Sequence, residues 1–354
     1  MYKPRLLLSM LLCVGLFTAC TRSHLDIFPD LSNQALVDKK LSVTEMKEDI
    51  AALYLGILER HPDLSSYAKS ALIENEVKRL QEELSQPLNR VDFYRIVGQL
   101  SHQFNDGHSF LIWPYQEYVA LQEAGNKPFP FEIEINPEGT FITKSYSNGT
   151  QTIAAGSKIL AINNQDMQTL IDQAQRYVGG ETQHLREQFF AARFSQTLWS
   201  VFGYINDFNL LINNQQEQIL LPINAAQSWQ EISGSNGKQQ DDFYYKALTD
   251  DVGYLYIGHF DVDPDWFETF IDSSFEQIKR NNIQSLIIDI RNNIGGNTDT
   301  AEYLASYLAQ EPVRMVSAVK EKLNHDNRGL FNYRGNVGEI LNRACNRFCV
   351  TAII

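Results

Sequence analysis

Apolar residues recur at helical spacing in the first third of the chain. Ser42 and Glu45 form the pattern of a capping box. The helix that they begin is expected to end at His61-Pro62, because the residue before a proline disfavours helical angles. A second, strongly charged helix is expected over about 70–84. Residues 42–125 are therefore expected to form a helical N-terminal domain.

The pattern changes after a third helical stripe, which runs from Phe93 to Phe104. That stripe breaks at Asn105-Asp106-Gly107, which is a strong turn signal, and Phe110 to Trp113 is expected to be a strand. From about residue 128, alternating apolar residues predict short strands and a closing hairpin. Two helices are expected between them, and residues 126–226 are read as a second domain.

The last region, residues 241–354, alternates strand and helix. Tyr254–Ile257 predicts one strand. Leu286–Ile290 is a continuous apolar run, which is typical of a strand buried on both faces. Each strand precedes an amphipathic helix, so a parallel or mixed sheet covered by helices is expected. The predicted fold class is α/β, in several domains.

The first 20 residues have the pattern of a targeting segment. Lys3 and Arg5 precede an apolar run from Leu6 to Phe17 that is too short to span a membrane and ends in Ala19-Cys20. Small residues before a cysteine favour a lipoprotein signal, with Cys20 lipidated and residues 21–41 as a polar tether. A plain secretory signal peptide is the alternative. The expected location is exported and membrane-anchored.

Charge and cysteine content exclude two classes of site. The net charge of -13 argues against a nucleic-acid partner, which requires a basic face. Beyond the leader only Cys345 and Cys349 follow Cys20, and one pair without a second does not make a zinc site. No metal is expected.

Two short motifs carry candidate chemistry. Asp289–Gly296 runs from an apolar strand into paired glycines, whose bare N–H groups can converge on an oxyanion; most such loops are only turns. Asp106-Gly107-His108-Ser109 places a histidine, the usual general base near neutral pH, just past a turn; a histidine that simply begins a strand is the alternative. The remaining histidines, including His61, are interpreted as surface or packing residues.

Four segments occur in the order of one known family: His61-Pro62-Asp63-Leu64, Asp106–Ser109, Gly156–Asn163 and Leu286–Gly296. Together they resemble the tail-specific, or C-terminal processing, serine proteases, on the tricorn-like side of that family. The resemblance covers about residues 42–320. Residues 156–163 resemble the core of a PDZ domain, which captures peptide C-termini by strand addition.

The resemblance implies a peptidase without metal or organic cofactor that cleaves polypeptides, often after a PDZ-like domain over 126–226 has bound a free C-terminus. A serine at a strand–helix junction attacks the carbonyl. By position, Gly295 and Gly296 hold the oxyanion, His108 is the base, and Ser109 orients it. The protease core would occupy 241–354.

The chain departs from the family where the nucleophile should be. The last serine is Ser317, in an expected strand without a glycine-rich turn, and the last lysine is Lys322. Two cysteines within five residues then resemble out-of-frame translation or a truncated gene. We therefore expect that this chain lacks the nucleophile and is, when expressed alone, inactive and poorly soluble because the apolar edge of its incomplete sheet is unpaired.

Two alternatives remain open. The chain could be a non-catalytic, membrane-anchored protein that binds hydrophobic C-terminal peptides through its PDZ-like domain. Alternatively, Ser317 or Cys345 could serve as the nucleophile of a variant enzyme.

Overall fold

The computed structural model describes residues 38–354 except 215–216, 233–241, 292, 294, 329–334, 345–348 and 351–354. Cys20 and Cys345 lie outside the described residues. Among the residues that are described, no helix combines the length and the apolar character needed to cross a membrane.

The helical unit begins as the sequence predicts. The Ser42 Oγ accepts the Glu45 N–H at 3.2 Å, and Glu45 Oε2 accepts the Ser42 N–H at 2.7 Å, which confirms the capping box. The first helix ends at His61, as expected. The helices of this unit are α2 (Val43–Arg60), α3 (Leu64–Tyr67), α4 (Ser70–Glu83), α5 (Arg90–Val97), the 3-10 helix η2 (Gly98–Phe104) and α6 (Tyr115–Glu123).

Two predictions in this unit differ from the structure. The third helical stripe forms α5 and then tightens into η2. The predicted strand over Phe110–Trp113 is wrong, because this segment has no strand neighbour; the Leu111 N–H instead donates to the Ser101 Oγ at 3.0 Å. Helix α6 begins immediately afterwards.

The second unit is built on an antiparallel sheet with the order β1-β2-β5-β7-β8. Its strands are β1 (Ile133–Asn136), β2 (Gly139–Ile142), β5 (Lys158–Ile162), β7 (Asp207–Asn214) and β8 (Glu217–Asn224), with β6 (Gln165–Asp166) beside β5. A smaller sheet joins β3 (Tyr146–Ser147), β4 (Thr152–Ile153) and β9 (Gln230–Glu231). The helices are α7 (Met167–Ala174), η3 (Gln175–Tyr177), α8 (Gln183–Ala192) and α9 (Phe194–Phe202). Two helices were expected between the strands, but the region of the second forms two helices, α8 and α9, which meet at Arg193.

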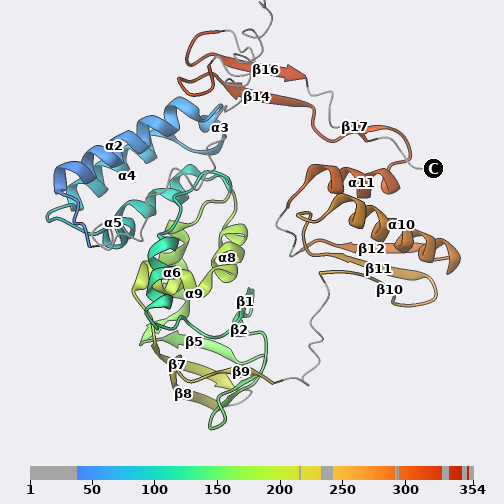
Figure 1. Ribbon diagram of the computed structural model, residues 1–354, viewed down its shortest axis with the longest axis horizontal. Coiled ribbons are helices and arrows are strands. Elements are labelled where there is room, and N and C mark those ends of the chain that lie inside the picture. The colour runs from blue at the N-terminus through green and yellow to red at the C-terminus, as the bar shows by residue number, and fades with distance from the viewer. Residues whose placement is uncertain are drawn as a thin grey trace, which may run out of the picture.

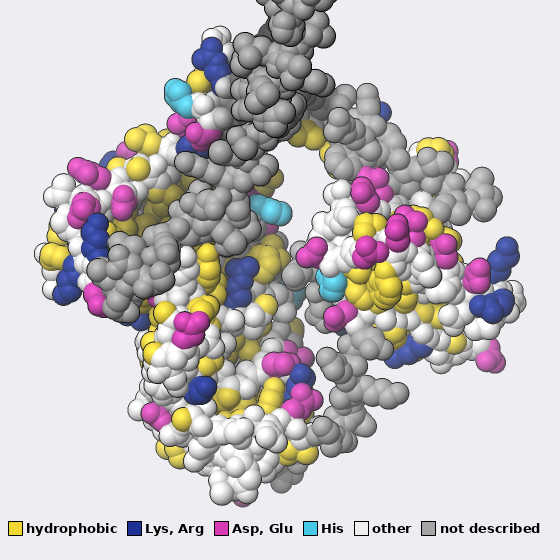
Figure 2. Space-filling view, viewed as in Figure 1, with side chains coloured by type: hydrophobic (Ala, Val, Ile, Leu, Met, Phe, Trp, Pro, Cys, Tyr) yellow, Lys and Arg dark blue, Asp and Glu magenta, His cyan; other side chains and the backbone are white. Residues whose placement is uncertain are grey.

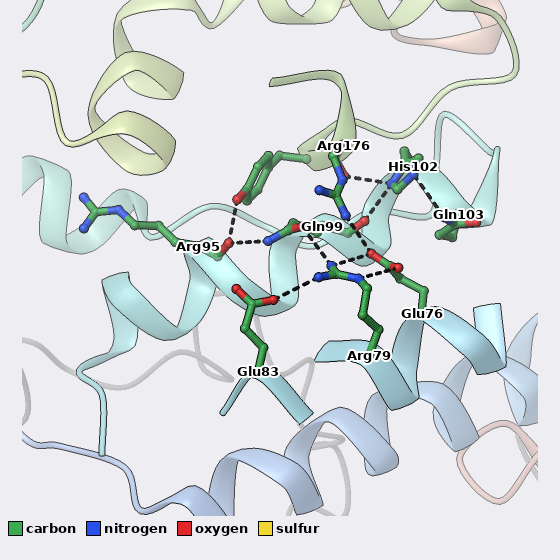
Figure 3. A network of polar contacts seen from close by, with 9 residues as sticks. Glu76, Arg79, Glu83, Arg95, Gln99, His102, Gln103 and Arg176 are labelled. Atoms are coloured by element: carbon green, nitrogen blue, oxygen red, sulfur yellow. Dashed lines mark hydrogen bonds and ion pairs between the residues drawn. The ribbon is translucent and has the colours of Figure 1, made fainter. Parts of the chain in front are cut away.

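A polar network joins the helical unit to η3 (Figure 3). Glu76 accepts hydrogen bonds from Arg79 at 2.8 Å and from Arg176 at 2.9 Å. The His102 ring contacts the Arg176 carbonyl at 3.2 Å, and burial lowers the pKa of that imidazole. The network fixes the start of the segment that follows η3, which reaches the candidate site.

The third unit confirms the predicted parallel pairing. β11 (Val252–Ile257) and β12 (Ser285–Asp289) are parallel, and β10 (Phe243–Ala247) adds an antiparallel strand to β11. Helices α10 (Pro264–Arg280) and α11 (Thr298–Leu308) lie on one face of this sheet (Figure 1). The expectation that β12 is buried on both faces is wrong, because the helices cover one face only and Ile287 on the other is 47% exposed.

A hairpin returns from the third unit to the first (Figure 1). It consists of β14 (Ala318–Lys322) and β16 (Ile340–Ala344), and β13 (Val313–Arg314) pairs with β17 (Cys349–Val350). Ser317 lies at a bend between β13 and β14 and not within a strand. The Lys322 Nζ donates to the Leu58 carbonyl at 2.6 Å, so the hairpin contacts the end of α2.

Candidate active site

His108 lies on a tight turn that follows η2. Asn105 precedes the turn with φ 51°, a left-handed conformation that asparagine tolerates. The His108 side chain is 99% exposed, and its Nδ1 lies 3.8 Å from Asp106 Oδ1. Its backbone N–H donates to the same oxygen at 2.9 Å. The turn therefore presents the imidazole to solvent with a carboxylate behind it.

Asp106 is the centre of this turn. Its Oδ2 accepts the Ser109 hydroxyl at 2.6 Å and lies 3.4 Å from the His61 Nε2. Burial alone would raise the pKa of Asp106, but hydrogen bonds from Ser109, the His108 N–H and His61 outweigh it and lower that pKa. The Ser109 hydroxyl, expected to orient His108, is bonded to Asp106 instead.

His61 is the site residue that sequence reasoning missed. The sequence predicts a surface or packing residue here; the His61 side chain is only 8% exposed, and its Nε2 in addition faces Asp106. Its Nδ1 accepts the Asp63 N–H at 3.1 Å, and its ring packs edge-on against Tyr67. The available signal was that the motifs around His61 and His108 are both polar segments at helix ends.

These residues line one cavity of about 700 Å³. The end of α2 and the His108 turn form most of its wall, and Lys320 of β14 contributes from the hairpin. The Lys320 Nζ lies 2.9 Å from Asp63 Oδ2. The cavity lining consists of Ile57, Arg60, His61, Pro62, Asp63, Ser66, Tyr67, Asp106, His108, Ser109 and Lys320.

The segment after η3 supports the turn from the other side. A Cβ at Gly179 would lie 2.5 Å from the Asp106 carbonyl oxygen, so the two backbones touch. The Gly107 N–H donates to Glu181 Oε1 at 3.4 Å. The second unit therefore holds the turn that carries His108.

The predicted oxyanion loop lies at the end of β12. Gly295 and Gly296 have φ of 95° and 140°, where other residues are strained. The Phe260 N–H donates to the Gly295 carbonyl at 2.7 Å, and a Cβ at Gly296 would lie 2.1 Å from the Asp261 nitrogen. The Gly295 N–H is used by Asn293 Oδ1 at 2.8 Å. Of the two predicted donors, only the Gly296 N–H has no acceptor among the described residues.

A second polar cluster fixes the start of this loop. Arg291 donates to both carboxylate oxygens of Asp289, at 2.9 and 2.6 Å, and Tyr254 of β11 donates to one of them. Asp289 is 6% exposed. Arg291 and then Tyr254 hold the pKa of Asp289 well below its usual range, while Asp289 raises the pKa of Tyr254 to about 12.

The structure does not bring the two halves of the predicted site together. The described lining of the His108 cavity includes neither Gly295 nor Gly296. Figure 2 shows an open space between the body that carries α2 to β9 and the body that carries β10 to α11. Ser317 does not line the His108 cavity either. Within the described residues, no group of His, Cys, Asp or Glu is arranged to hold a metal ion.

The sheet of the second unit carries another cavity, of about 500 Å³. Strands β1, β2 and β5 form one side, and α7 and α8 form the other. β1 is an edge strand, and its Ile135 carbonyl accepts the Gln188 amide of α8 at 3.0 Å. Helix α8 therefore covers part of that edge.

The fold is similar to that of known proteins. No sequence among the curated proteins matches the chain. Mature CPAF is similar in structure, with a TM-score of 0.56 and 15% sequence identity over 80% of this chain and 62% of the CPAF chain. The structure of mature CPAF complexed with lactacystin gives a TM-score of 0.55 and 14% identity, and the match covers 80% of this chain and 63% of that one. The photosystem II D1 C-terminal processing protease gives 0.37 and 10% over 78% and 67%, too weak to align elements.

CPAF therefore shows the fold, and this chain spans less than two thirds of the length of CPAF. The family resemblance lies in the sequence of the last part of the chain. Residues 251–340, which include β12 and the Gly-Gly loop, match the profile of Peptidase family S41. Residues 251–340 are therefore similar in sequence to peptidase family S41, the tail-specific or C-terminal processing proteases.

Proposed function

We propose that this protein is a serine-type peptidase, which hydrolyses peptide bonds in polypeptides through an acyl-enzyme. The observation that carries the proposal is the family match over the Gly-Gly loop, together with a histidine that is exposed in a cavity and backed by a carboxylate. A histidine with a carboxylate behind it is the arrangement that removes a proton from a nucleophile and later returns it to the leaving amine.

In this proposal His108 is the general base and the Gly296 N–H is an oxyanion donor. Gly295 joins it if the Asn293 side chain releases its N–H, which Asn293 now accepts at 2.8 Å. Hydrolysis requires the third unit to approach the His108 cavity, because the oxyanion donors and the base now belong to separate bodies. Ser317 does not line the His108 cavity, and this proposal does not assign it as the nucleophile.

The remaining roles follow from the same proposal. The helical unit and the third unit together carry the catalytic groups. The second unit, which contains β1 to β9, is a PDZ-like domain that binds free C-termini in the cavity between β1 and α7. Such binding by strand addition at β1 requires α8 to release the Ile135 carbonyl. Export and a lipid anchor at Cys20 would place this chemistry at a membrane surface.

The test uses the gene expressed with its downstream sequence in every frame, and unfolded casein as the substrate. We expect His108→Ala to lower kcat by about 10²–10⁴-fold, the usual contribution of a general base, with KM nearly unchanged. His325→Ala is the matched control, because His325 is also exposed but is absent from the cavity lining. Equal activity in wild type and His108→Ala would refute the proposal.

A second function has one observation in its favour, the cavity between β1 and α7. A peptide-binding protein without catalysis would bind a hydrophobic C-terminal peptide in the 354-residue chain, and His108→Ala would leave that affinity unchanged. Fluorescence anisotropy with a labelled peptide measures this directly. Absence of hydrolysis by every longer product, together with such binding, would favour this second function.

A further inference from the structure

Two histidines from distant parts of the chain share one carboxylate. His61 closes α2, and His108 lies on the turn after η2. The His61 Nε2 lies 3.4 Å from one oxygen of Asp106, and the His108 N–H and ring face the other oxygen. Only His108 is exposed in the cavity, since the His61 side chain is 8% exposed.

The backbone determines which nitrogen of His61 faces Asp106. Pro62 disfavours helical angles in the residue before it, and His61 adopts φ -68° and ψ 124° as the C-cap of α2. This bend lets the Asp63 N–H donate to the His61 Nδ1 at 3.1 Å. A neutral imidazole whose Nδ1 accepts a hydrogen bond carries its hydrogen on Nε2. The hydrogen therefore points at Asp106.

This contact restricts the Asp106 carboxylate. Its Oδ2 receives the Ser109 hydroxyl at 2.6 Å and faces His61, so that Oδ1 is left to face His108. The His108 Nδ1 lies 3.8 Å from Oδ1, and the exposed ring has room to rotate into hydrogen-bond distance of it. A fixed carboxylate behind one ring nitrogen sets the tautomer of a catalytic histidine.

We propose that His61 is a positioning residue that, through Asp106, fixes the orientation and tautomer of His108. This rests on the proposed function for the role of His108 as base. The charged groups around the pair are few: Asp63 is paired with Lys320 at 2.9 Å, Arg60 with Asp326 at 2.5 Å, and Glu181 contacts the Gly107 N–H at 3.4 Å. None of these contacts reaches Asp106 Oδ2, which leaves His61 and Ser109 to restrain it.

Two substitutions separate the two polar contacts of the His61 ring, with the Asp63 N–H and with Asp106. His61→Gln places an amide N–H near the position of Nε2 and keeps the donor to Asp106, whereas His61→Asn places an amide oxygen near Nδ1 and keeps only the acceptor for the Asp63 N–H. The 354-residue chain is labelled with 13C and 15N, and NMR follows the Asp106 carboxyl carbon through a pH titration and the ring nitrogens of His108 at neutral pH.

We expect the Asp106 carboxyl to titrate below its ordinary range in the wild type and in His61→Gln, and to titrate at higher pH in His61→Asn. The His108 ring of the wild type and of His61→Gln should show one dominant tautomer with hydrogen on Nδ1, and that of His61→Asn a mixture. Unchanged Asp106 titration and an unchanged His108 tautomer in a folded His61→Asn protein would overturn the proposal.

If His61→Asn does not fold, Asp106→Asn provides the second measurement, because it leaves His61 in place. The His61 ring should then keep its Nδ1 acceptor while the His108 tautomer becomes mixed; an unchanged His108 tautomer would overturn the proposal. These readouts need no hydrolysis, so they fail independently of the proposed function. In a longer, active product, His61→Asn should in addition lower kcat about tenfold and leave KM unchanged, with His61→Gln restoring it.

Discussion

Single atoms decide how closely the second unit approaches the His108 turn. Gly179 has no side chain, and a Cβ there would lie 2.5 Å from the Asp106 carbonyl oxygen and 3.3 Å from that of Ser109. Backbone atoms cannot move aside as the tip of a flexible side chain can. A single methyl group therefore displaces either the turn or the segment that supports it.

We predict that Gly179→Ala destabilises the protein by about 1–3 kcal/mol, the usual cost of an added methylene in a packed site. Gly56→Ala is the matched control, because Gly56 lies within α2 and its Cβ would meet only the flexible end of Arg60. That change should stabilise by up to about 1 kcal/mol. Urea unfolding of both variants measures the difference, and equal stabilities would contradict the steric argument.

At the scale of elements, the ends of two parallel strands are held together by one carboxylate. Asp289 ends β12, accepts from Tyr254 of β11, and binds Arg291 of the following loop. The strand pair and the Gly-Gly loop therefore share one anchor. Arg291 is 84% exposed, so that solvent screens part of this interaction.

The depressed pKa of Asp289 gives this anchor a pH dependence. A carboxyl whose pKa is lower in the folded state contributes stability above its unfolded value, about 3.9, and loses it as the pH falls through the folded value. We predict that Asp289→Asn lowers the free energy of unfolding by about 1–2 kcal/mol at neutral pH. The difference between the wild type and this variant should become smaller below about pH 4. Urea unfolding across pH measures it. Glu268→Gln, on the exposed side of α10, is the control, and its free energy of unfolding should equal that of the wild type at each pH.

The elements also show how far the sequence predicts this fold. The capping box at Ser42, the closing hairpin β7–β8 and the parallel pair β11–β12 follow from local or repeating signals, and all three are confirmed. The strand expected at Phe110–Trp113 is wrong because extended residues become a strand only with a neighbour, which no local pattern specifies. The apolar run of β12 likewise does not reveal that one face lacks a cover.

The candidate site is less predictable for the same physical reason. The pattern Asp-Gly-His placed His108 beside Asp106, a contact two residues apart. The contact between His61 and Asp106 spans 45 positions, and only the folded chain shows that the end of α2 reaches the turn after η2. The separation of the Gly-Gly loop from His108 is equally invisible to a linear motif.

On the scale of the whole molecule, the hairpin of β14 and β16 is attached to the end of α2 mainly by exposed charges. Arg60 pairs with Asp326 at 2.5 Å, and Glu59 with His325 at 2.8 Å. The His325 contacts lower the pKa of Glu59, and Asp63 raises the pKa of Lys320. Such pairs weaken in salt because counter-ions screen them.

We predict that about 1 M NaCl, at which the Debye length is about 3 Å, loosens this attachment. Hydrogen exchange of peptides that cover the end of α2 should become faster, and Asp326→Asn should produce part of the same change at low salt. Glu74→Gln is the control, because its pair with Lys78 lies within α4. Exchange that is insensitive to salt would indicate that the hydrogen bond from the Lys322 ammonium to the Leu58 carbonyl, which is not an ion pair, holds the hairpin.

The contribution of Lys320 to the cavity has a consequence for biosynthesis. Its partner Asp63 lies 257 residues earlier in the chain. At a synthesis rate of about 5–20 residues per second, roughly 13–50 seconds pass between the emergence of these two residues. During that time the nascent chain carries His108 on a turn whose pocket has no Lys320. The pocket therefore obtains its complete lining only after β14, which contains Lys320, has been synthesised.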